Sequence, residues 1–398
     1  MVKNRLHLLN RALIFIALFY FISDLSWTQS ENIHSRGIWI LRDGLYSPAS
    51  IDSALTFAAN SGFDKVFVQV RSRGDALYES NYVKKNDKVQ VDFDPLAYMI
   101  ELGHELDLEI HIWFNTYLLW SARKPPTDSN HIYFTKNQWT EANHFGKMDW
   151  RIDISHPPSP DWEGIYLSPI HPEVNPYIIM LINEIMENYS IDGVHLDYLR
   201  YQDDFYGYNP TGCKIFKDKY GLDPIDITRG IISTRFGWTQ TEVDSINSLW
   251  SSFKKEHITD LLSDLRYEID NHFPGIKLSA AVKPNIITAE NRWAQDWVNW
   301  IDNGLLDFAV PMNYYKENKD FLADLFLMKS TISVSNLSNV MIGVATYNQV
   351  ANSTAEKIIL ARKNGFYSIC VFSYNSHMNN LDWFYPVIDA FDLPLNQD

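Results

Sequence analysis

Residues 191–201 carry the most concentrated set of groups that could do chemistry, because a short apolar strand there ends in a carboxylate, Asp197. His195 stands two residues earlier, so both side chains would leave the strand on the same face. A carboxyl group in this position can donate a proton, accept one or attack as a nucleophile. We predict that Asp197 is the central catalytic residue and that His195 orients it or tunes its pKa. An ion pair of Asp197 with Arg71 or Arg200 is the structural alternative.

Cleavage of a glycosidic bond is the reaction that most often uses carboxyl groups in pairs, one on each side of the bond. Six acidic residues fall on or near the predicted mouth of the site, and their spacing does not rank them: Asp149, Asp153, Glu163, Asp203, Asp204 and Asp296. An N-acetyl group of the substrate could replace one of the two carboxyls. The second partner of Asp197 therefore stays open at this level.

Other chemistries lack their sequence patterns. Neither a His-Glu-x-x-His motif nor a Gly-x-Ser-x-Gly motif is present, which argues against zinc hydrolases and the common serine esterases. Only Cys213 and Cys370 occur, without a metal-ligand spacing. We expect no metal ion and no cofactor. The formal net charge of −15 is unfavourable for binding nucleic acid or anionic lipid. We expect a polysaccharide partner, and a neutral glycan fits this negative charge better than a nucleic acid or an anionic lipid does.

The elements that must position these groups alternate between short apolar strands and longer helical patterns. Eight strands are predicted, near residues 37–41, 65–71, 109–115, 193–197, 276–283, 307–313, 340–346 and 368–374. Helices are predicted between them, near residues 51–60, 95–106, 176–189, 250–273, 291–302, 319–333, 354–363 and 380–391. This α/β pattern is typical of a (β/α)8 TIM barrel. An open doubly wound sheet is the alternative, but no GxGxxG or phosphate-loop motif follows the first strand.

No Pro-, Gly- or Ser-rich linker divides the chain, so we expect one barrel domain over residues 31–398. Long insertions are predicted after the third strand, at 116–175, and after the fourth, at 198–249. Both would rise at the C-terminal strand ends, the face on which such barrels carry active sites. They are rich in Trp and Tyr, whose rings can stack on sugars, although packing of the loops is the alternative for any single ring.

The alternation within strands predicts which side chains face the barrel interior. In the second strand three valines share one face, while Phe67, Gln69 and Arg71 share the other. The third strand similarly sets Ile and Phe against His111, Trp113 and Asn115. Because a barrel interior filled only for stability is Val, Ile and Leu, inward polar groups at the strand ends indicate a functional site.

Residues 1–30 form a separate N-terminal segment. Lys3, Arg5 and Arg11 precede the apolar run 12–22, which is about half the length of a bilayer-spanning helix. This pattern is typical of a secretory signal peptide, and an uncleaved anchor is the alternative. We expect an exported protein that is periplasmic, secreted or held at the outer side of the membrane through this segment alone.

The chain resembles the glycosyl hydrolase-like family ten, bacterial envelope proteins related to glycoside hydrolases. The motifs that carry the resemblance lie in order and mostly at strand ends: Arg36–Trp39, Val68–Arg71, Gly74–Tyr78, His111–Asn115, Asp192–Tyr198, Gln295–Trp297, Pro311–Tyr315 and Phe372–Tyr374. The resemblance implies a barrel fold and hydrolysis of glycan strands, including peptidoglycan glycan freed of its stem peptides. The segments 123–126, 150–153 and 168–172 depart from the usual family sequence, which bears on substrate choice.

The resemblance also supplies site residues. It implies Asp296 as the catalytic partner of Asp197. Together with the strand-end positions, it predicts substrate-binding roles for Arg71, Asp75, Asn115, Tyr198, Asn313, Tyr314, Tyr347 and Tyr374. Our leading hypothesis is a glycoside hydrolase, retaining or inverting, acting on a cell-envelope or extracellular polysaccharide. A non-catalytic carbohydrate-binding barrel and an anchored scaffold protein of the envelope are the rival hypotheses.

Overall fold

The computed structural model describes residues 34–395. Eight parallel strands form one sheet in the order β8-β7-β6-β3-β2-β1-β10-β9. Their bounds are β1 Ser35–Ile40, β2 Lys65–Arg71, β3 Glu109–Asn115, β6 Gly193–Asp197, β7 Lys277–Val282, β8 Phe308–Pro311, β9 Met341–Ala345 and β10 Ser368–Phe372. Two parallel bridges, Ala309 with Val340 and Met312 with Gly343, join β8 to β9 and nearly close the barrel. The predicted (β/α)8 barrel is confirmed.

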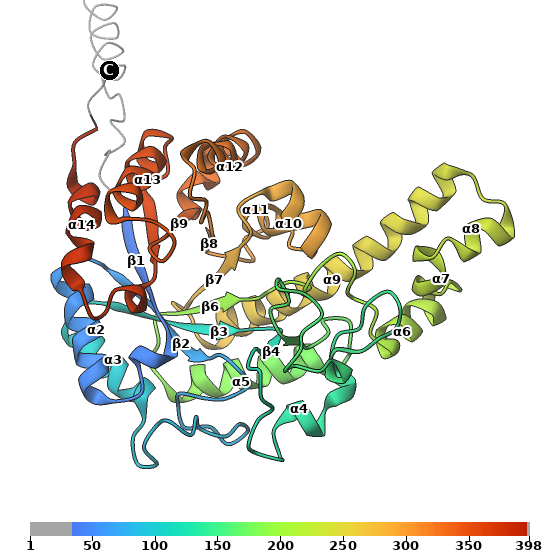
Figure 1. Ribbon diagram of the computed structural model, residues 1–398, viewed down its shortest axis with the longest axis horizontal. Coiled ribbons are helices and arrows are strands. Elements are labelled where there is room, and N and C mark those ends of the chain that lie inside the picture. The colour runs from blue at the N-terminus through green and yellow to red at the C-terminus, as the bar shows by residue number, and fades with distance from the viewer. Residues whose placement is uncertain (1–33, 396–398) are drawn as a thin grey trace, which may run out of the picture.

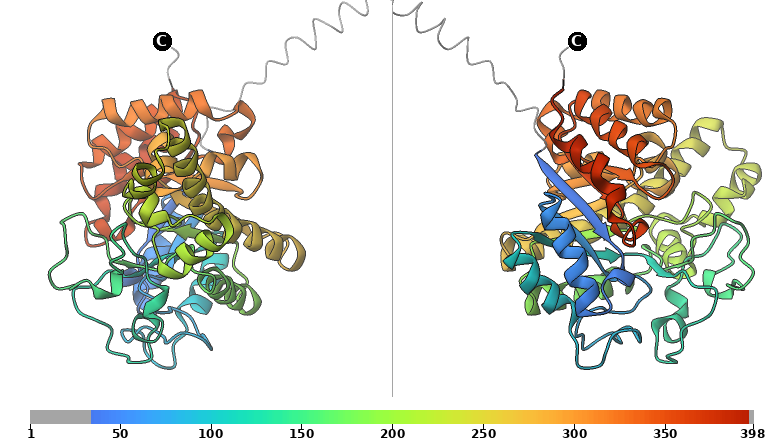
Figure 2. Two further views of the ribbon diagram at one scale, coloured as in Figure 1. Left: turned by 90° about the vertical axis from the view of Figure 1, so that its right-hand side faces the viewer. Right: turned by 60° about the vertical axis from the view of Figure 1, so that its left-hand side comes forward.

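Helices cover the outer side of the barrel (Figures 1 and 2). They are α2 Pro48–Asn60, α3 Pro95–Glu105, α5 Val174–Asn188, α9 Gln240–His272, α10 Ile286–Trp293, α11 Trp297–Asp302, α12 Asn318–Thr331, α13 Ala351–Lys363 and α14 Tyr385–Asp392. Several begin where the sequence supplies a cap. Asp94 accepts from the backbone N–H groups of Leu96 and Ala97 at the start of α3, which satisfies donors that a helix leaves free.

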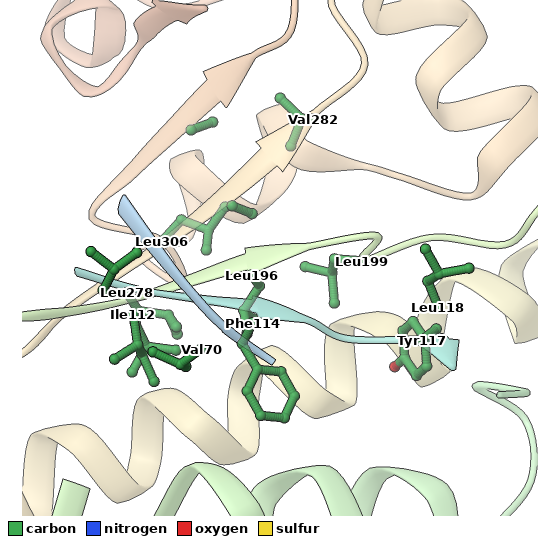
Figure 3. Packing of buried hydrophobic residues seen from close by; sticks show 14 of the residues in the cluster. Val70, Ile112, Phe114, Tyr117, Leu118, Leu196, Leu199, Leu278, Val282 and Leu306 are labelled. Carbon is green, nitrogen blue, oxygen red and sulfur yellow. The ribbon is translucent and has the colours of Figure 1, made fainter. Parts of the chain in front are cut away.

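The two faces of the sheet differ as the alternation predicts. Val70, Ile112 and Phe114 are fully buried among the helix-facing side chains, and Figure 3 shows this layer beside the strands. The barrel interior holds a separate cluster with Trp39, Phe67 and other large side chains. Side chains therefore fill the barrel interior below the mouth, so a substrate can reach only the C-terminal ends of the strands.

The predicted helix over 291–302 is wrong as one continuous element. It is divided into α10 and α11, because Ala294 adopts a left-handed conformation with φ of 54°. A left-handed residue cannot continue a right-handed helix. The break places Gln295 and Asp296 on the connection between two short helices, which decides where their side chains point.

Two chain segments lie at the C-terminal strand ends. The segment between β3 and α5 contains β4 Leu118–Trp120, α4 Ile132–Thr135 and β5 Ile165–Tyr166. The segment between β6 and the long helix α9 contains α6 Pro210–Tyr220, α7 Pro224–Thr228 and α8 Ile231–Phe236. An antiparallel bridge between Asn143 and Tyr206 joins the two segments, which lie side by side at one end of the barrel (Figure 1).

The segment 1–30, predicted to be a signal peptide or anchor, lies outside the described residues. From residue 34 to residue 395, no helix has both the length and the apolar character needed to cross a bilayer. Cys213 and Cys370 are both buried free thiols, and Cys370 packs in the barrel interior.

Candidate active site

Asp197 ends β6 at the mouth of the barrel and is only 7% exposed. The indole N–H of Trp113 donates to its Oδ2 at 3.1 Å, and the backbone N–H of Tyr198 donates to its Oδ1 at 2.7 Å. Burial raises the pKa of Asp197 to about 6, against the opposing effects of the Tyr198 N–H and the positive charge of Arg200. The carboxyl group is therefore able to exist in both protonation states near neutral pH.

Tyr198 holds the strand end in an unusual conformation. Its φ is 52°, in the left-handed region that few bulky residues adopt. The backbone N–H of this residue is the one that donates to the carboxyl group of Asp197. Backbone strain of this kind persists where the surroundings enforce it, and it is frequent at functional sites.

Glu163 is the second carboxyl group at this mouth. It comes from the chain just before β5, and both of its oxygens accept from Nη2 of Arg200, at 2.9 and 2.8 Å. The hydroxyl of Tyr166 also donates to it. Burial opposes ionisation of Glu163, but the charges of Arg200 and Lys283 outweigh it and lower its pKa. Arg200, one of the two arginines considered as ion-pair partners of Asp197, thus pairs with Glu163 instead.

The environments of the two carboxyl groups push their pKa values apart. The negative charge of Glu163 helps to raise the pKa of Asp197, so the two groups act on each other. Lys283, at the end of β7, acts on both, and burial lowers its own pKa to about 8. A carboxyl with a raised pKa beside one with a lowered pKa is the arrangement that separates a proton donor from an ionised partner.

The predicted partner Asp296 is not in this group. Its pKa is raised by burial and by the charge of Glu290, and Lys255 opposes the shift. Lys255 lies on α9 and Glu290 on α10, on the helical side of the barrel. The neighbouring Gln295 takes the inward position, where its Oε1 accepts from the backbone N–H of Lys283. The helix break at Ala294 accounts for this outcome.

The other acidic candidates are also engaged elsewhere. Asp203 pairs with Arg292 at 2.8 Å, and Asp204 interacts with Asp203. Asp153 caps its own loop through Ser155. Asp149 is fully buried in the segment after β3, where the backbone N–H of Tyr166 donates to it. Of the six acidic candidates, Glu163 is therefore the one whose charge acts on the pKa of Asp197.

His195, predicted to orient Asp197 or to tune its pKa, has a structural position. It is fully buried inside the barrel, where its Nε2 lies 3.2 Å from Trp39 Nε1 and its Nδ1 lies 2.9 Å from the hydroxyl of Ser279. Burial, together with the charge of His111, lowers its pKa well below the usual value. A neutral ring accepts from Trp39 and donates to Ser279, so His195 braces the interior below Asp197.

Arg71 also departs from its prediction, because a β-bulge reverses the alternation at the end of β2. The register with β3 shifts between Gln69 and Arg71, so that Arg71 lies opposite Phe114. Its guanidinium carbon lies 4.8 Å from the centre of the Phe114 ring, on the helix-facing side, and Nη1 donates to the carbonyl of Asn115. An extra residue in one strand exchanges the two faces beyond it.

The remaining predicted binding residues fall into two groups. Asn115 and Tyr198 line a cavity of about 370 Å³ at the ends of β1, β2, β3 and β6. Tyr314 and Tyr347 stand at the mouth, each in contact with the ring of Phe372. By contrast, Asn313 donates to the carbonyl of Phe321 on α12, Tyr374 packs on Phe57 of α2, and Asp75 accepts from the backbone of its own loop.

The 370 Å³ cavity is the best candidate for a sugar-binding cleft. Three hollows are larger: one of about 630 Å³ lies between α5 and α9, and those of about 560 Å³ and 540 Å³ lie at the N-terminal strand ends. Active sites of this fold lie at the C-terminal ends. Within the described part of the chain, no cluster of three His, Cys, Asp or Glu side chains is arranged to hold a metal ion.

Fold and site together define a barrel of the glycoside hydrolase type, with two carboxyl groups at its C-terminal mouth. A sequence profile described as Glycosyl hydrolase-like 10 matches residues 34–358. The chain therefore belongs to this family, as the sequence motifs predict.

Two glycosyl hydrolases are distant relatives of this chain in sequence. Glycosyl hydrolase DigH of Escherichia coli (strain K12) is 24% identical over 332 residues, which cover 72% of this chain and 67% of DigH. Glycosyl hydrolase YngK of Bacillus subtilis (strain 168) is 24% identical over 283 residues, covering 64% of this chain and 46% of YngK. The chain thus spans about half the length of YngK and two thirds of DigH.

Solved structures show the same fold. The PgaB (BpsB) glycoside hydrolase domain from Bordetella bronchiseptica has a TM-score of 0.65 at 13% identity, over 91% of this chain and 99% of that one. The catalytic domain of a β-amylase from Paenibacillus polymyxa has a TM-score of 0.57 at 14% identity, over 88% and 94%. The protein thus has a glycosidase-like fold.

Proposed function

We propose that this protein hydrolyses O-glycosidic bonds of a polysaccharide, with Asp197 as the proton donor. The observation that carries the proposal is the pair of carboxyl groups with opposite pKa shifts at one barrel mouth. Burial brings the pKa of Asp197 to about 6, so a useful fraction of the group is protonated at neutral pH. Glu163, held ionised by Arg200, supplies the opposite charge state.

In the proposed reaction, the proton of Asp197 passes to the glycosidic oxygen as the bond from this oxygen to the anomeric carbon breaks. The positive charge that develops on the sugar ring is stabilised by nearby carboxylates. A water molecule adds its hydroxyl group to the anomeric carbon and gives its remaining proton to a base, for which ionised Glu163 is the candidate. The anomer of the released sugar, read by NMR, distinguishes inversion from retention.

For the substrate we propose a glycan of the cell envelope or extracellular matrix, with peptide-free peptidoglycan strands as the first example. Membership of the glycosyl hydrolase-like family and the likeness to glycosyl hydrolase DigH support cleavage of a glycan. The aromatic side chains Tyr198, Tyr314 and Tyr347 around the mouth suit sugar rings. Such a substrate requires an exported protein, in agreement with the signal predicted in residues 1–30.

Digestion of a panel of purified glycans, with products identified by mass, tests the proposal. We expect Asp197→Asn to reduce cleavage at least about 100-fold, the contribution of a positioned acid, while glycan binding persists. Asp296→Asn is the matched control, because its carboxyl faces the helices, and we expect it to cleave like the wild type. Binding without cleavage by the wild-type protein across the panel would favour the carbohydrate-binding alternative instead.

A further inference from the structure

A second cavity, of about 230 Å³, adjoins the cleft and is lined by an unusual number of cations. It shares Arg42, Tyr46 and Lys88 with the 370 Å³ cavity that Tyr198 lines. Arg73, Trp120 and Asp75 also line it. We call this cavity the basic pocket. Through these shared residues it lies next to the cavity that is lined by Tyr198, the residue that follows Asp197.

Three cations of the basic pocket lack carboxylate partners. Among the described residues, no carboxylate lies within 4 Å of a side-chain nitrogen of Arg42, Arg73 or Lys88, although Lys84 at the same cavity pairs with Asp87 at 2.6 Å. Arg42 donates instead to the hydroxyl of Ser72. These cations therefore keep their charge available to a ligand, in a protein whose net charge is −15.

The two arginines of the basic pocket are close enough to repel each other. Burial lowers the pKa of Arg73 and the positive charge of Arg42 lowers it further, while the negative charge of Asp75 opposes the shift. Arg73 is held in place because its Nε donates to the hydroxyl of Ser121 at 3.0 Å. Holding two guanidinium groups together is unfavourable without an anion. An anionic ligand would relieve this repulsion.

The negative charge of Asp75 acts on both arginines, but its carboxylate oxygens accept hydrogen bonds from other donors. Its Oδ1 accepts from the backbone N–H groups of Arg73 and Ser72, at 2.9 and 3.3 Å, and its Oδ2 accepts from Asn86. These bonds fix the loop after β2. They also occupy backbone N–H groups, which is the kind of donor that phosphate sites present to their ligand. The remaining donors are planar guanidinium groups, which can hold a carboxylate through two parallel hydrogen bonds, as they can a phosphate.

Two aromatic rings accompany the cations. The ring of Tyr46 lies 5.2 Å from the ammonium of Lys88, and the ring of Trp120 lies 6.0 Å from the guanidinium carbon of Arg73. Both rings are partly exposed at the cavity. Aromatic faces pack against the apolar faces of sugars. A ring face beside an unpaired cation suits a sugar that carries a negative group.

We propose that the basic pocket is a subsite for a sugar bearing a carboxylate, with Arg42 and Arg73 binding the carboxylate and Lys88 attracting it at the rim. The inference rests on the proposed glycosidase function, because the subsite would hold a sugar of the chain that Asp197 cleaves. It differs from the expectation of a neutral glycan. The carboxylate could be a lactyl group on a muramic acid or the ring carboxylate of a uronic acid.

The test compares two forms of one substrate. Peptide-free peptidoglycan strands carry a lactyl carboxylate on alternate sugars, and carbodiimide activation followed by borohydride converts it to an alcohol. We expect the wild type to cleave the native strands with a kcat/KM at least about ten-fold higher, equivalent to about 1.4 kcal/mol. Arg73→Gln and Lys88→Gln should each lower this ratio toward one. Lys84→Gln, the matched control at the same cavity, should keep it.

The outcomes separate the subsite from the reaction. Equal cleavage of both forms by the wild type would overturn the subsite and leave glycosidase activity standing. If neither form is cleaved, calorimetry on the same two glycans decides: tighter binding of the native form that is lost in Arg73→Gln supports the subsite without the reaction, and equal or absent binding overturns both. A glucuronic-acid oligosaccharide distinguishes the two carboxylate sources. Stronger competition by a sugar phosphate would overturn the choice of carboxylate.

Discussion

The hydrogen bond from Trp113 to Asp197 provides the most direct test of the proposed acid. The indole N–H donates to Oδ2 at 3.1 Å, in a buried setting. A hydrogen bond to a charged acceptor contributes about 1.5–3 kcal/mol, and one to a neutral acceptor about 0.5–1.5 kcal/mol. Trp113→Phe removes a bond that favours the ionised form by the difference, about 1–1.5 kcal/mol. The pKa of Asp197 should therefore rise by about one unit.

This shift has a defined effect on the pH profile. With Asp197 acting as a proton donor, kcat/KM falls as pH rises through its pKa of about 6. In Trp113→Phe this descending limb should move to about pH 7. At pH 7 the protonated fraction of Asp197 would rise from about a tenth in the wild type to about a half in the variant. At this pH the variant should therefore keep a larger fraction of its own plateau kcat/KM than the wild type keeps of its own. The assay is glycan cleavage measured across pH.

The position of the limb, not the plateau rate, is the measurement, because Trp113 also packs edge-on against Phe372 at 6.0 Å. Trp39→Phe is the matched control. It removes an indole from the same interior cluster, but this indole donates to His195. An unmoved limb in Trp113→Phe, or an equal movement in both variants, would refute the reasoning. Movement of the ascending limb instead would show that Asp197 acts in its ionised form.

Three further variants test other groups. Arg200→Met removes the charge that holds down the pKa of Glu163, so the ascending limb of kcat/KM should move to higher pH. Burial raises the pKa of Glu141 to about 7, above its unfolded value, so the wild type loses stability as pH rises from about 4.5 through 7. Glu141→Gln should abolish this loss: its free energy of unfolding in urea should match the wild type near pH 4 and exceed it by about 3 kcal/mol at pH 8. Tyr374→Phe, whose ring packs on Phe57, should leave kcat/KM unchanged.

The barrel and Asp197 could be predicted because both depend on local patterns. Strand alternation fixes which residues face the interior, and a polar residue at a C-terminal strand end falls on the functional face. His195 obeys the same alternation, yet it lies deeper in the barrel, where its ring is enclosed by Trp39 and Ser279. Alternation gives the direction of a side chain and not its depth.

The errors arise where one residue changes the backbone path. The bulge beside Arg71 and the left-handed Ala294 before Asp296 each redirect a side chain that the regular pattern would place at the site. Glu163 could not be ranked first for a different reason. Its position depends on the path of the segment after β3, which contacts the segment after β6 through the bridge of Asn143 with Tyr206. Such long-range contacts leave no local periodicity.

Net charge is a weak guide to the proposed ligand for a related reason. A formal charge of −15 describes the whole surface, whereas screening limits each exposed charge to a range of about 10 Å. Arg42 follows β1, whereas Arg73 and Lys88 both lie on the connection from β2 to α3, so the three cations are spread over residues 42–88 of the sequence. Their convergence beside the cleft follows from the parallel strands, because loops at the C-terminal ends of β1 and β2 must lie next to each other. Local charge at the strand ends, and not the total, therefore decides which sugar the cleft can hold.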